Sequence, residues 1–225
     1  MSRTLKYEIP GDDPRLSFAD VVATGWDELF AKTRSPRAAD SETPRKRVLE
    51  IGFGRGEFLL EMAARSPEVD FVGIEISFKR TLKMARKVAR AKRTNIRLIE
   101  GHAQAALKQL FRPGSLSEIW LNFSDPWPKA RHAHRRVVQA PFVADAARAL
   151  EVGGLLHVAT DDVRYAHQIG EVLAAESTLF NHYAPWPFLN DVPGRTRTGY
   201  EEQWRAVERP MHFFVYATAA RAEFG

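Results

Sequence analysis

Short apolar segments alternate with amphipathic segments along most of this chain, and this alternation constrains the fold more than any other feature. Segments rich in β-branched and aromatic residues predict strands at residues 47–53, 70–76, 95–100, 117–123, 154–160, 179–183 and 212–218. Apolar residues at helical spacing predict helices at residues 56–64, 79–92, 103–110, 138–150 and 163–175. We therefore expect an α/β fold, with a mostly parallel seven-stranded sheet and helices on both faces.

The first 46 residues do not follow this alternation, and we expect them to form an N-terminal extension. They read as irregular up to about Phe18, and a polar loop with two prolines is expected over residues 34–46. Between these segments a short helix is expected, because apolar residues recur near helical spacing at Val21, Val22, Trp26, Leu29 and Phe30. The remaining residues, 47–225, are enough for one domain with a substantial core.

Composition excludes several classes of chemistry. The chain has no cysteine, which rules out disulfides, thiolate catalysis and Cys-based metal sites. Its seven histidines are scattered without zinc-like spacing, so we expect no metal. Residues 1–10 lack the apolar core of a signal peptide, and no apolar run approaches bilayer length. We therefore expect a cytoplasmic protein with no membrane contact.

Positive charge is clustered rather than dispersed. The net charge of +5 is modest, but residues 79–97 contain nine Lys or Arg and no acid. Residues 129–136 contain four more, together with His132 and His134, and again no acid. Clusters of this kind are typical of nucleic-acid-binding surfaces. The alternative for either run is a solvated helix face.

A glycine-rich turn follows the first strand of the predicted sheet. It reads Glu50-Ile-Gly52-Phe-Gly54-Arg-Gly56. Ligands bind beyond the carboxyl ends of such strands. A dinucleotide loop would have its third glycine at position 57, which is Glu57. The pattern favours a ligand that carries an amino group and no phosphates.

S-adenosylmethionine fits this description. Glu50 could hold its amino group, while Gly52, Gly54 and Gly56 allow the backbone to approach it closely. Glu75 closes the second strand, where a carboxylate can accept both ribose hydroxyls. The turn after the third strand holds His102 and Ala103, and this turn could contact the adenine. The alternative readings are a tight turn with two incidental acids and a surface histidine.

The segment after the fourth strand carries the most specific pattern in the chain. Asp125 is followed by Pro126, Trp127 and Pro128, which stiffen the backbone beside the expected cofactor site. Trp127 could stack on a base or pack in the core, and Asp125 could be catalytic or only cap the loop. The polar residues that come next suit contacts to phosphates: Lys129, Arg131 and His132.

Together these segments resemble the bacterial tRNA (guanine-N7-)-methyltransferase family. The resemblance runs from about residue 47 to residue 216 and rests on LEIGFGRGEFLLEMA, FVGIEIS, NFSDPWPKARHAHRR, the ATD at 159–161 and a late TGYEE. It implies a Rossmann-like class I methyltransferase fold and S-adenosylmethionine as cofactor. It also implies methylation of a guanine in tRNA, at position 46 of the variable loop.

The resemblance also implies roles for individual residues. Glu50, Glu75 and Asp125 would line the cofactor and guanine site, with Asp125 as the catalytic residue. The substrate side would consist of residues from three segments: Lys129, Arg131, His132, Asp161, Thr198, Gly199, Tyr200 and Glu201. The sequence leaves open whether the protein is a monomer or a homodimer.

This chain departs from the family pattern in three places. His102 stands where Asp is usual, and Gln203 stands where Lys or Arg is usual. An Arg-rich N-terminal segment is missing, because residues 1–30 hold only Arg3, Lys6 and Arg15 as cations. His102 and Gln203 keep one rival hypothesis open, an RNA-binding protein with a decayed cofactor site. A second rival is a small-molecule methyltransferase, which would not need the basic runs.

Overall fold

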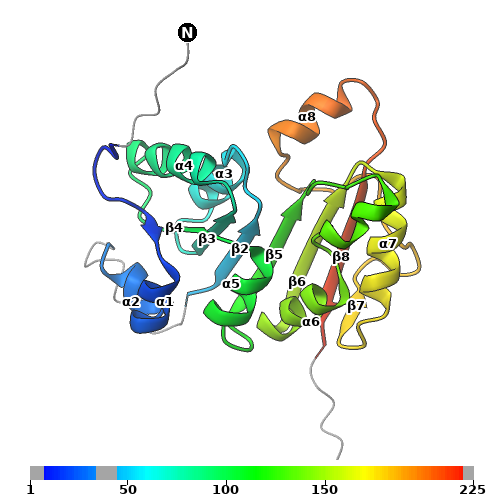
Figure 1. Ribbon diagram of the computed structural model, residues 1–225, viewed down its shortest axis with the longest axis horizontal. Helices are drawn as coiled ribbons and strands as arrows, with labels where there is room; N and C mark the ends of the chain where they lie inside the picture. Colours follow the sequence, from blue (N-terminus) through cyan, green and yellow to red (C-terminus); the bar gives the residue numbers. More distant parts are fainter. Residues whose placement is uncertain (1–7, 34–44, 220–225) are drawn as a thin grey trace, which may run out of the picture.

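The computed structural model describes residues 8–33 and 45–219, which form one layered α/β structure around an eight-stranded sheet (Figure 1). The strand order is β1-β4-β3-β2-β5-β6-β8-β7. Only β8 runs antiparallel to its neighbours, β6 and β7. The strands are β1 (Arg15–Leu16), β2 (Arg47–Ile51), β3 (Asp70–Glu75), β4 (Ile96–Glu100), β5 (Leu116–Asn122), β6 (Leu150–Thr160), β7 (Leu179–Asn181) and β8 (His212–Thr218).

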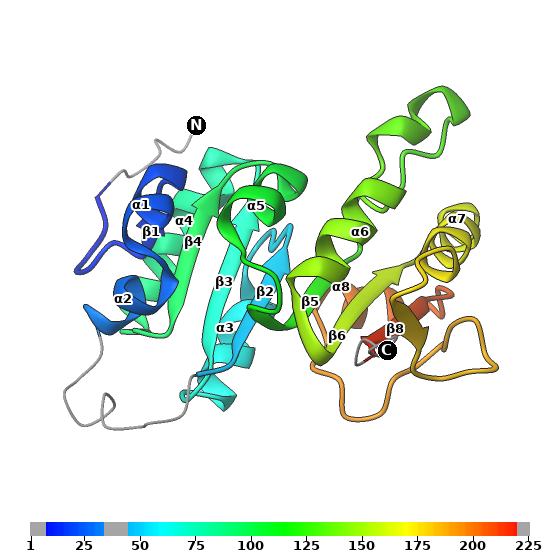
Figure 2. The same ribbon diagram turned by 90° about the horizontal axis from the view of Figure 1, so that it is seen from below.

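Helices cover both faces of the sheet, as Figure 2 shows from below. One face carries α1 (Phe18–Thr24), α5 (Ala103–Leu110), α6 (Ala140–Ala149) and α7 (Val163–Ala174), which contact one another in that order. The other face carries α3 (Glu57–Arg65) and α4 (Phe78–Arg90). The remaining helical segments are α2 (Trp26–Ala31), the 3-10 helix η2 (Ala130–Arg135) and α8 (Gly199–Arg205).

Alternation along the buried strands divides the core into two main layers. On β2, Leu49 and Ile51 face the α5, α6 and α7 side, while Val48 faces α3 and α4. All three are at most 5% exposed. Successive side chains of a strand point to opposite faces, so a parallel sheet buried on both sides needs nearly continuous apolar strands. The apolar runs of the sequence meet this requirement.

The predicted fold class is confirmed, with one strand more than expected. Two residues of the predicted irregular N-terminal segment, Arg15 and Leu16, pair with Leu98 and Ile99 of β4 and add an edge strand. The single N-terminal helix predicted from spacing is two helices, because Gly25 at φ 83° separates α1 from α2. This part of the extension packs onto the sheet domain, while residues 34–44 of the predicted loop lie outside the described residues.

Two short helical segments were not predicted from the sequence, and both matter for the site. Thr198 caps α8, and its hydroxyl accepts a hydrogen bond from the backbone N–H of Glu201. The other segment, η2, covers the basic loop. Segments of six or seven residues show too little periodicity to be recognised in advance.

Two features are absent from the described ranges. No helix in residues 8–33 or 45–219 is long and apolar enough to cross a bilayer. The same residues contain no group of three or more His, Asp or Glu side chains placed to hold a metal ion.

Candidate active site

The site is organised by the reversal of strand order at β2. From β2 the chain builds outward through β3 and β4 on one side, and then returns to add β5 and β6 on the other. Beyond the carboxyl ends of β2 and β5 the connections diverge, and open α/β sheets bind ligands at this point. The glycine turn follows β2 and the Asp125 segment follows β5, so the two predicted motifs share one sheet edge.

The glycine turn needs its glycines for two different reasons. Gly52, Gly54 and Gly56 have φ of 70°, 54° and 77°, a region that side chains with a Cβ rarely adopt. At Gly56 a Cβ would lie 2.1 Å from the sulfur of Met84, because α4 packs against the turn. At Gly52 a Cβ would meet nothing within 4 Å, so this part of the turn borders open space. The turn is therefore packed behind Gly56 and open at Gly52.

Glu50 is a buried carboxylate without a full set of partners. The residue is 3% exposed, and its Oε2 accepts no hydrogen bond from the described residues. Burial raises the pKa of Glu50 to about 8, while Asn122 and the charge of Arg195 act in the opposite direction. A buried acceptor left unsatisfied costs folding free energy. A cationic ligand group beside Glu50 would satisfy it.

Glu75 braces the glycine turn from the end of β3. Its Oε2 accepts a hydrogen bond from the backbone N–H of Gly54 at 3.1 Å, and its Oε1 accepts one from Ser77 at 3.1 Å. Arg80 approaches the same Oε2 at 3.6 Å. Each carboxylate oxygen can accept more than one bond, so capacity remains for ligand hydroxyls. Glu75 thus couples the turn to α4.

His102 and Ala103 begin α5 at the end of β4. The Gly101 N–H donates to the Glu75 carbonyl at 3.0 Å, which places this turn beside the end of β3. His102 is the exposed N-cap of α5, and its side chain makes no capping hydrogen bond. Ala103 is the first residue of the helix. The structure thus places this turn at the carboxyl edge of the sheet, as predicted, and the His102 imidazole does not cap α5.

The segment after β5 has a strained backbone and an exposed carboxylate. Phe123 and Trp127 have φ of 51° and 43°, which costs a bulky residue about 1–3 kcal/mol. Arg136 holds the segment in place: it donates to the Pro126 carbonyl at 2.8 Å and lies 5.2 Å over the Tyr165 ring. Asp125 is exposed between the two strained positions. Strain of this kind concentrates at functional sites.

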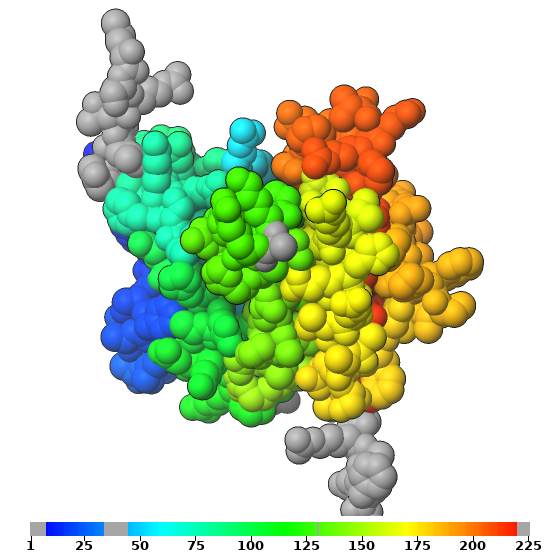
Figure 3. All heavy atoms as spheres, turned by 45° about the vertical axis from the view of Figure 1, so that its right-hand side comes forward, coloured from blue at the N-terminus to red at the C-terminus, as the bar shows by residue number. Residues whose placement is uncertain are grey.

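Residues far apart in the sequence bring α8 onto this segment. The Tyr200 ring packs against Phe123 at 5.1 Å, and its hydroxyl donates to Asp161 at 2.9 Å. Arg209 also pairs with Asp161, at 2.8 Å. Figure 3 shows α8, in orange, at the same end of the molecule as the basic loop, in green. The structure therefore brings the predicted substrate-side segments together.

Arg195 is a site residue that the sequence analysis missed. It lies three residues before Thr198, and its side chain is 5% exposed. Its guanidinium donates to the side chains of Glu201 and Asn122. The only sequence signal was a cation just before the TGYEE motif, in a segment already rich in arginine. Its burial follows from tertiary packing, which the sequence does not reveal.

The predicted basic runs separate into surface cations and structural cations. The prediction that Arg97 belongs to a nucleic-acid-binding surface is wrong. The residue is 4% exposed, and its guanidinium donates to the Leu29 carbonyl at 2.9 Å and lies over the Phe30 ring. Arg136 holds the Asp125 segment. Lys87 pairs with Glu57 at 2.8 Å. Apart from the buried Arg97, the cations of the first run that form no ion pair within the described residues are Lys79, Lys83, Arg86, Arg90, Lys92 and Arg93. The first four of these lie on α4 and recur three and four residues apart.

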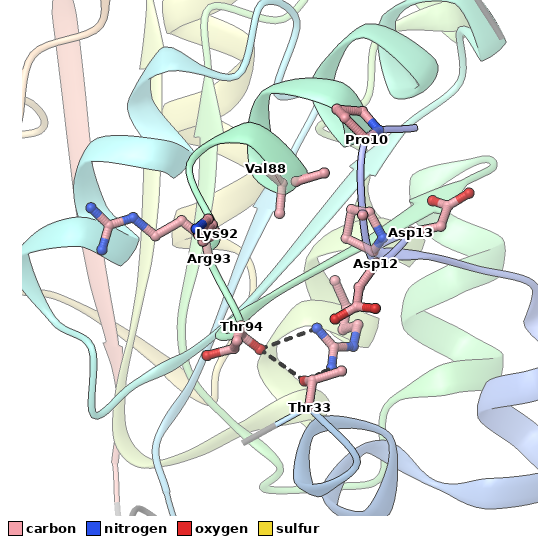
Figure 4. Close-up of a pocket in the computed structure, with 12 residues that line it drawn as sticks. Pro10, Asp12, Asp13, Thr33, Val88, Lys92, Arg93 and Thr94 are labelled. Carbon is pink, nitrogen blue, oxygen red and sulfur yellow. Dashed lines mark hydrogen bonds between the residues drawn. The ribbon is translucent and has the colours of Figure 1, made fainter. Parts of the chain in front are cut away.

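A cavity of about 340 Å³ lies at the opposite end of the sheet and is separate from this site (Figure 4). Asp12 and Asp13 line it from the N-terminal segment, and Lys92 and Arg93 line it from the turn before β4. The strands begin at this edge, whereas the glycine turn and Asp125 lie where strands end. The cavity therefore takes no part in the arrangement described above.

Comparisons with known proteins agree with this geometry. A family model described as a putative methyltransferase matches residues 44–214. Among solved structures, the aminoglycoside resistance methyltransferase NpmB1 superimposes with a TM-score of 0.57 at 17% identity, covering 86% of this chain and 93% of that one. The antibiotic-resistance methyltransferase Kmr gives 0.56 at 15% identity, covering 87% and 93%. Fold and site together define a class I methyltransferase.

Curated relatives show which family of methyltransferases the chain resembles. A tRNA (guanine-N(7)-)-methyltransferase of Burkholderia mallei is 39% identical over 193 residues, which are 83% of this chain and 69% of the relative. One of Thermotoga maritima is 34% identical over 190 residues, 84% of this chain and 56% of the relative. The chain belongs to the tRNA (guanine-N(7)-)-methyltransferase family. It is therefore an enzyme, and its cofactor is S-adenosylmethionine, which suits the unsatisfied Glu50 carboxylate and the open side of Gly52.

Proposed function

We propose that this protein transfers a methyl group from S-adenosylmethionine to N7 of a guanine in tRNA, at position 46 of the variable loop. The observation that carries the proposal is the meeting of two motifs at one sheet edge. The glycine turn with its unsatisfied Glu50 carboxylate lies beside the strained, cation-rich segment that presents Asp125. The names of the relatives supply the substrate, and the position in tRNA rests on the family resemblance.

Three parts of the chain would hold the cofactor. Glu50 would accept hydrogen bonds from the α-amino group, since its buried Oε2 has no partner among the described residues. Glu75 would accept from the ribose hydroxyls while it keeps its bonds to the turn. His102 and Ala103 would border the adenine. Bound S-adenosylmethionine supplies an electrophilic methyl group on a sulfonium.

The residues around guanine have a positioning and electrostatic task. N7 has an available lone pair and no proton, so its methylation needs no general base. Holding the reacting atoms in line can by itself accelerate a reaction greatly. The ring gains positive charge as the methyl arrives, and Asp125 would stabilise that charge and accept from N1–H and the 2-amino group. The rigid backbone at Phe123 and Trp127 would fix this carboxylate.

The other substrate-side residues would support the contact between Asp125 and the guanine. Asp161 and Tyr200 would hold α8 against Phe123, because their hydrogen bond and the ring contact join the three. Thr198 and Gly199 begin that helix, and Glu201 anchors it from within. These residues would form the wall against which an extruded base rests. Extrusion of a base costs a few kcal/mol, which contacts to the flanking phosphates offset.

Two sets of cations would contact the tRNA backbone. Lys129, Arg131 and His132 lie in the loop that begins just after Pro128 and would bind the phosphates beside the target nucleotide. The unpaired cations of α4 form a second surface. Their spacing of three and four residues places them on one side of the helix. Like charges at this spacing destabilise a helix, and a polyanion relieves the repulsion.

Methyl transfer to bulk tRNA with nucleoside analysis tests the proposal. We expect 7-methylguanosine in tRNA that lacks the modification, and none when position 46 is changed from guanine. Transfer to small molecules alone would support the small-molecule hypothesis. Cofactor binding without transfer to any substrate would support a binding role.

A further inference from the structure

Arg195 occupies the junction between the cofactor side and the substrate side of the site. It lies in the segment between β7 and α8, yet its guanidinium sits over the sheet, 4.8 Å from the Phe213 ring and 5.5 Å from the Trp120 ring. The Phe58 ring of α3 lies 5.8 Å from the same guanidinium. Three aromatic rings thus surround the cation, and its hydrogen bonds go to the Thr196 carbonyl, to Glu201 of α8 and to Asn122 at the end of β5. The packing holds the guanidinium in a fixed orientation.

The polar partners of Arg195 belong to both halves of the site. One nitrogen donates to Glu201 of α8, and the other donates to Oδ1 of Asn122 at the end of β5. Because the Oδ1 of Asn122 is engaged in this way, its Nδ2 remains as a donor, and this atom has no hydrogen-bond partner among the described residues. Trp120, the ring beneath the Arg195 guanidinium, is the β5 residue that pairs with Glu50 of β2, so the cation lies over the strand beside this carboxylate. The side chain of Asn122 and the charge of Arg195 both lower the pKa of Glu50 against the effect of burial.

Other charged groups act on Glu50 in the opposite sense. Glu57 at the start of α3 and Glu75 at the end of β3 both raise its pKa. Arg195 is thus the cation that opposes burial and two carboxylates. A cofactor ammonium binds well only to the ionised carboxylate, since the neutral acid offers no charge and one lone pair fewer.

We propose that Arg195 is a positioning residue that keeps Glu50 ionisable for the cofactor and ties this function to α8 through Glu201. The inference rests on the proposed role of Glu50, and it adds a residue that acts on the cofactor from the substrate side. Removal of the Arg195 charge should raise the pKa of Glu50. Cofactor affinity should then fall most at low pH, where fewer Glu50 carboxylates are ionised.

The direction of the pH effect distinguishes this role from a structural one. In the wild type, since burial raises the pKa of Glu50 to about 8, we expect affinity to rise with pH as Glu50 ionises. It falls again as the cofactor's own α-amino group loses its proton, which has a usual pKa of about 8. Each unit by which Arg195→Gln raises the pKa of Glu50 should cost about tenfold in affinity at low pH. The loss should shrink toward none at high pH, whereas a damaged fold would give the same loss at every pH.

The experiment is calorimetric titration of S-adenosylmethionine into wild type, Arg195→Gln and Arg205→Gln from pH 6 to 9.5. Arg205 is the matched control because it also pairs with Glu201, at 3.0 Å, but among the described residues no hydrogen bond joins it to Asn122. We expect a pH-dependent loss for Arg195→Gln and an affinity within twofold of wild type for Arg205→Gln. A loss that is constant with pH, or no loss, would overturn the proposal.

Two further variants keep the test decisive if Arg195→Gln folds poorly. Arg195→Met keeps an apolar side chain among the aromatic rings and removes only the charge, so it should show the same pH-dependent loss. In a Glu50→Gln background, the change at Arg195 should cost almost nothing, because the group it acts on is gone. An undiminished loss in that background would also overturn the proposal. Wild type that binds cofactor but methylates no tRNA would refute the proposed function and leave this inference standing.

Discussion

The two halves of the active site are built differently, although they share one sheet edge. The cofactor half comes from consecutive elements, β2, the glycine turn, α3 and β3, and Glu75 is 21 residues from the Gly54 amide it accepts from. The substrate half joins Phe123 to Tyr200 and Asn122 to Arg195, which is 73 residues away. The first half is largely buried, and the second presents Asp125 to solvent. Most segments that would contact the cofactor are thus close in sequence, whereas the substrate half and the proposed action of Arg195 on Glu50 depend on the whole fold.

The largest effect should come from the exposed half. Asp125→Ala should lower the rate of methyl transfer by about 10²–10³-fold, the scale for loss of one group that stabilises transition-state charge. Cofactor affinity and melting temperature should stay near wild type, since Asp125 is exposed. Single-turnover rates measured with saturating cofactor give the answer.

Asp162→Ala is the matched control for that change. Asp162 caps α7 through the N–H of Tyr165 at 2.7 Å, so its loss should cost about 1 kcal/mol of stability and leave the chemistry intact. If both variants transfer methyl groups at the wild-type rate, Asp125 has no catalytic role.

The next effect concerns the buried half. Glu75→Ala should weaken S-adenosylmethionine binding by about 1.5–3 kcal/mol, the scale of hydrogen bonds to a charged group. It should also lower the melting temperature, because two backbone N–H groups lose their acceptor. Titration calorimetry checks the first effect and thermal unfolding the second.

Glu57→Ala provides the comparison for Glu75. Glu57 is half exposed, and its ion pair with Lys87 contributes little to stability. Its loss should not weaken cofactor binding, and because Glu57 raises the pKa of Glu50, affinity should stay equal or rise slightly. Equal losses for the two variants would mean that the ribose does not meet Glu75.

A smaller effect is expected for single surface cations. Lys83→Ala should reduce the dependence of tRNA affinity on salt by about one unit of log–log slope, as loss of one phosphate contact requires. Lys87→Ala should change the slope less, because Lys87 is already neutralised by Glu57. Lys129→Ala should reduce the slope and also the transfer rate, since it follows Asp125 closely. If all three variants keep the wild-type salt slope, the α4 cations do not contact tRNA and are solvated surface charge.

The smallest effect should come from His102→Asp. The imidazole is exposed and makes no capping hydrogen bond, so its replacement should preserve or slightly improve cofactor affinity. An Asp would also cap α5 and accept from an adenine amino group. A loss of tenfold or more would show that His102 makes a specific contact of its own.

The sequence alone determined the fold class, the glycine turn and the residues after β2, β3 and β5. Apolar periodicity predicts the strands and helices. The glycine pattern indicates positions such as Gly56, where φ is positive and a Cβ would clash. Tertiary structure alone decided that Arg97 and Arg136 support the protein while Lys79, Lys83 and Arg90 of α4 are exposed. It also decided that Arg195 is buried beside Asn122. The sequence shows which residues carry charge, but the burial and the partners of each one depend on segments that meet only when the sheet has formed.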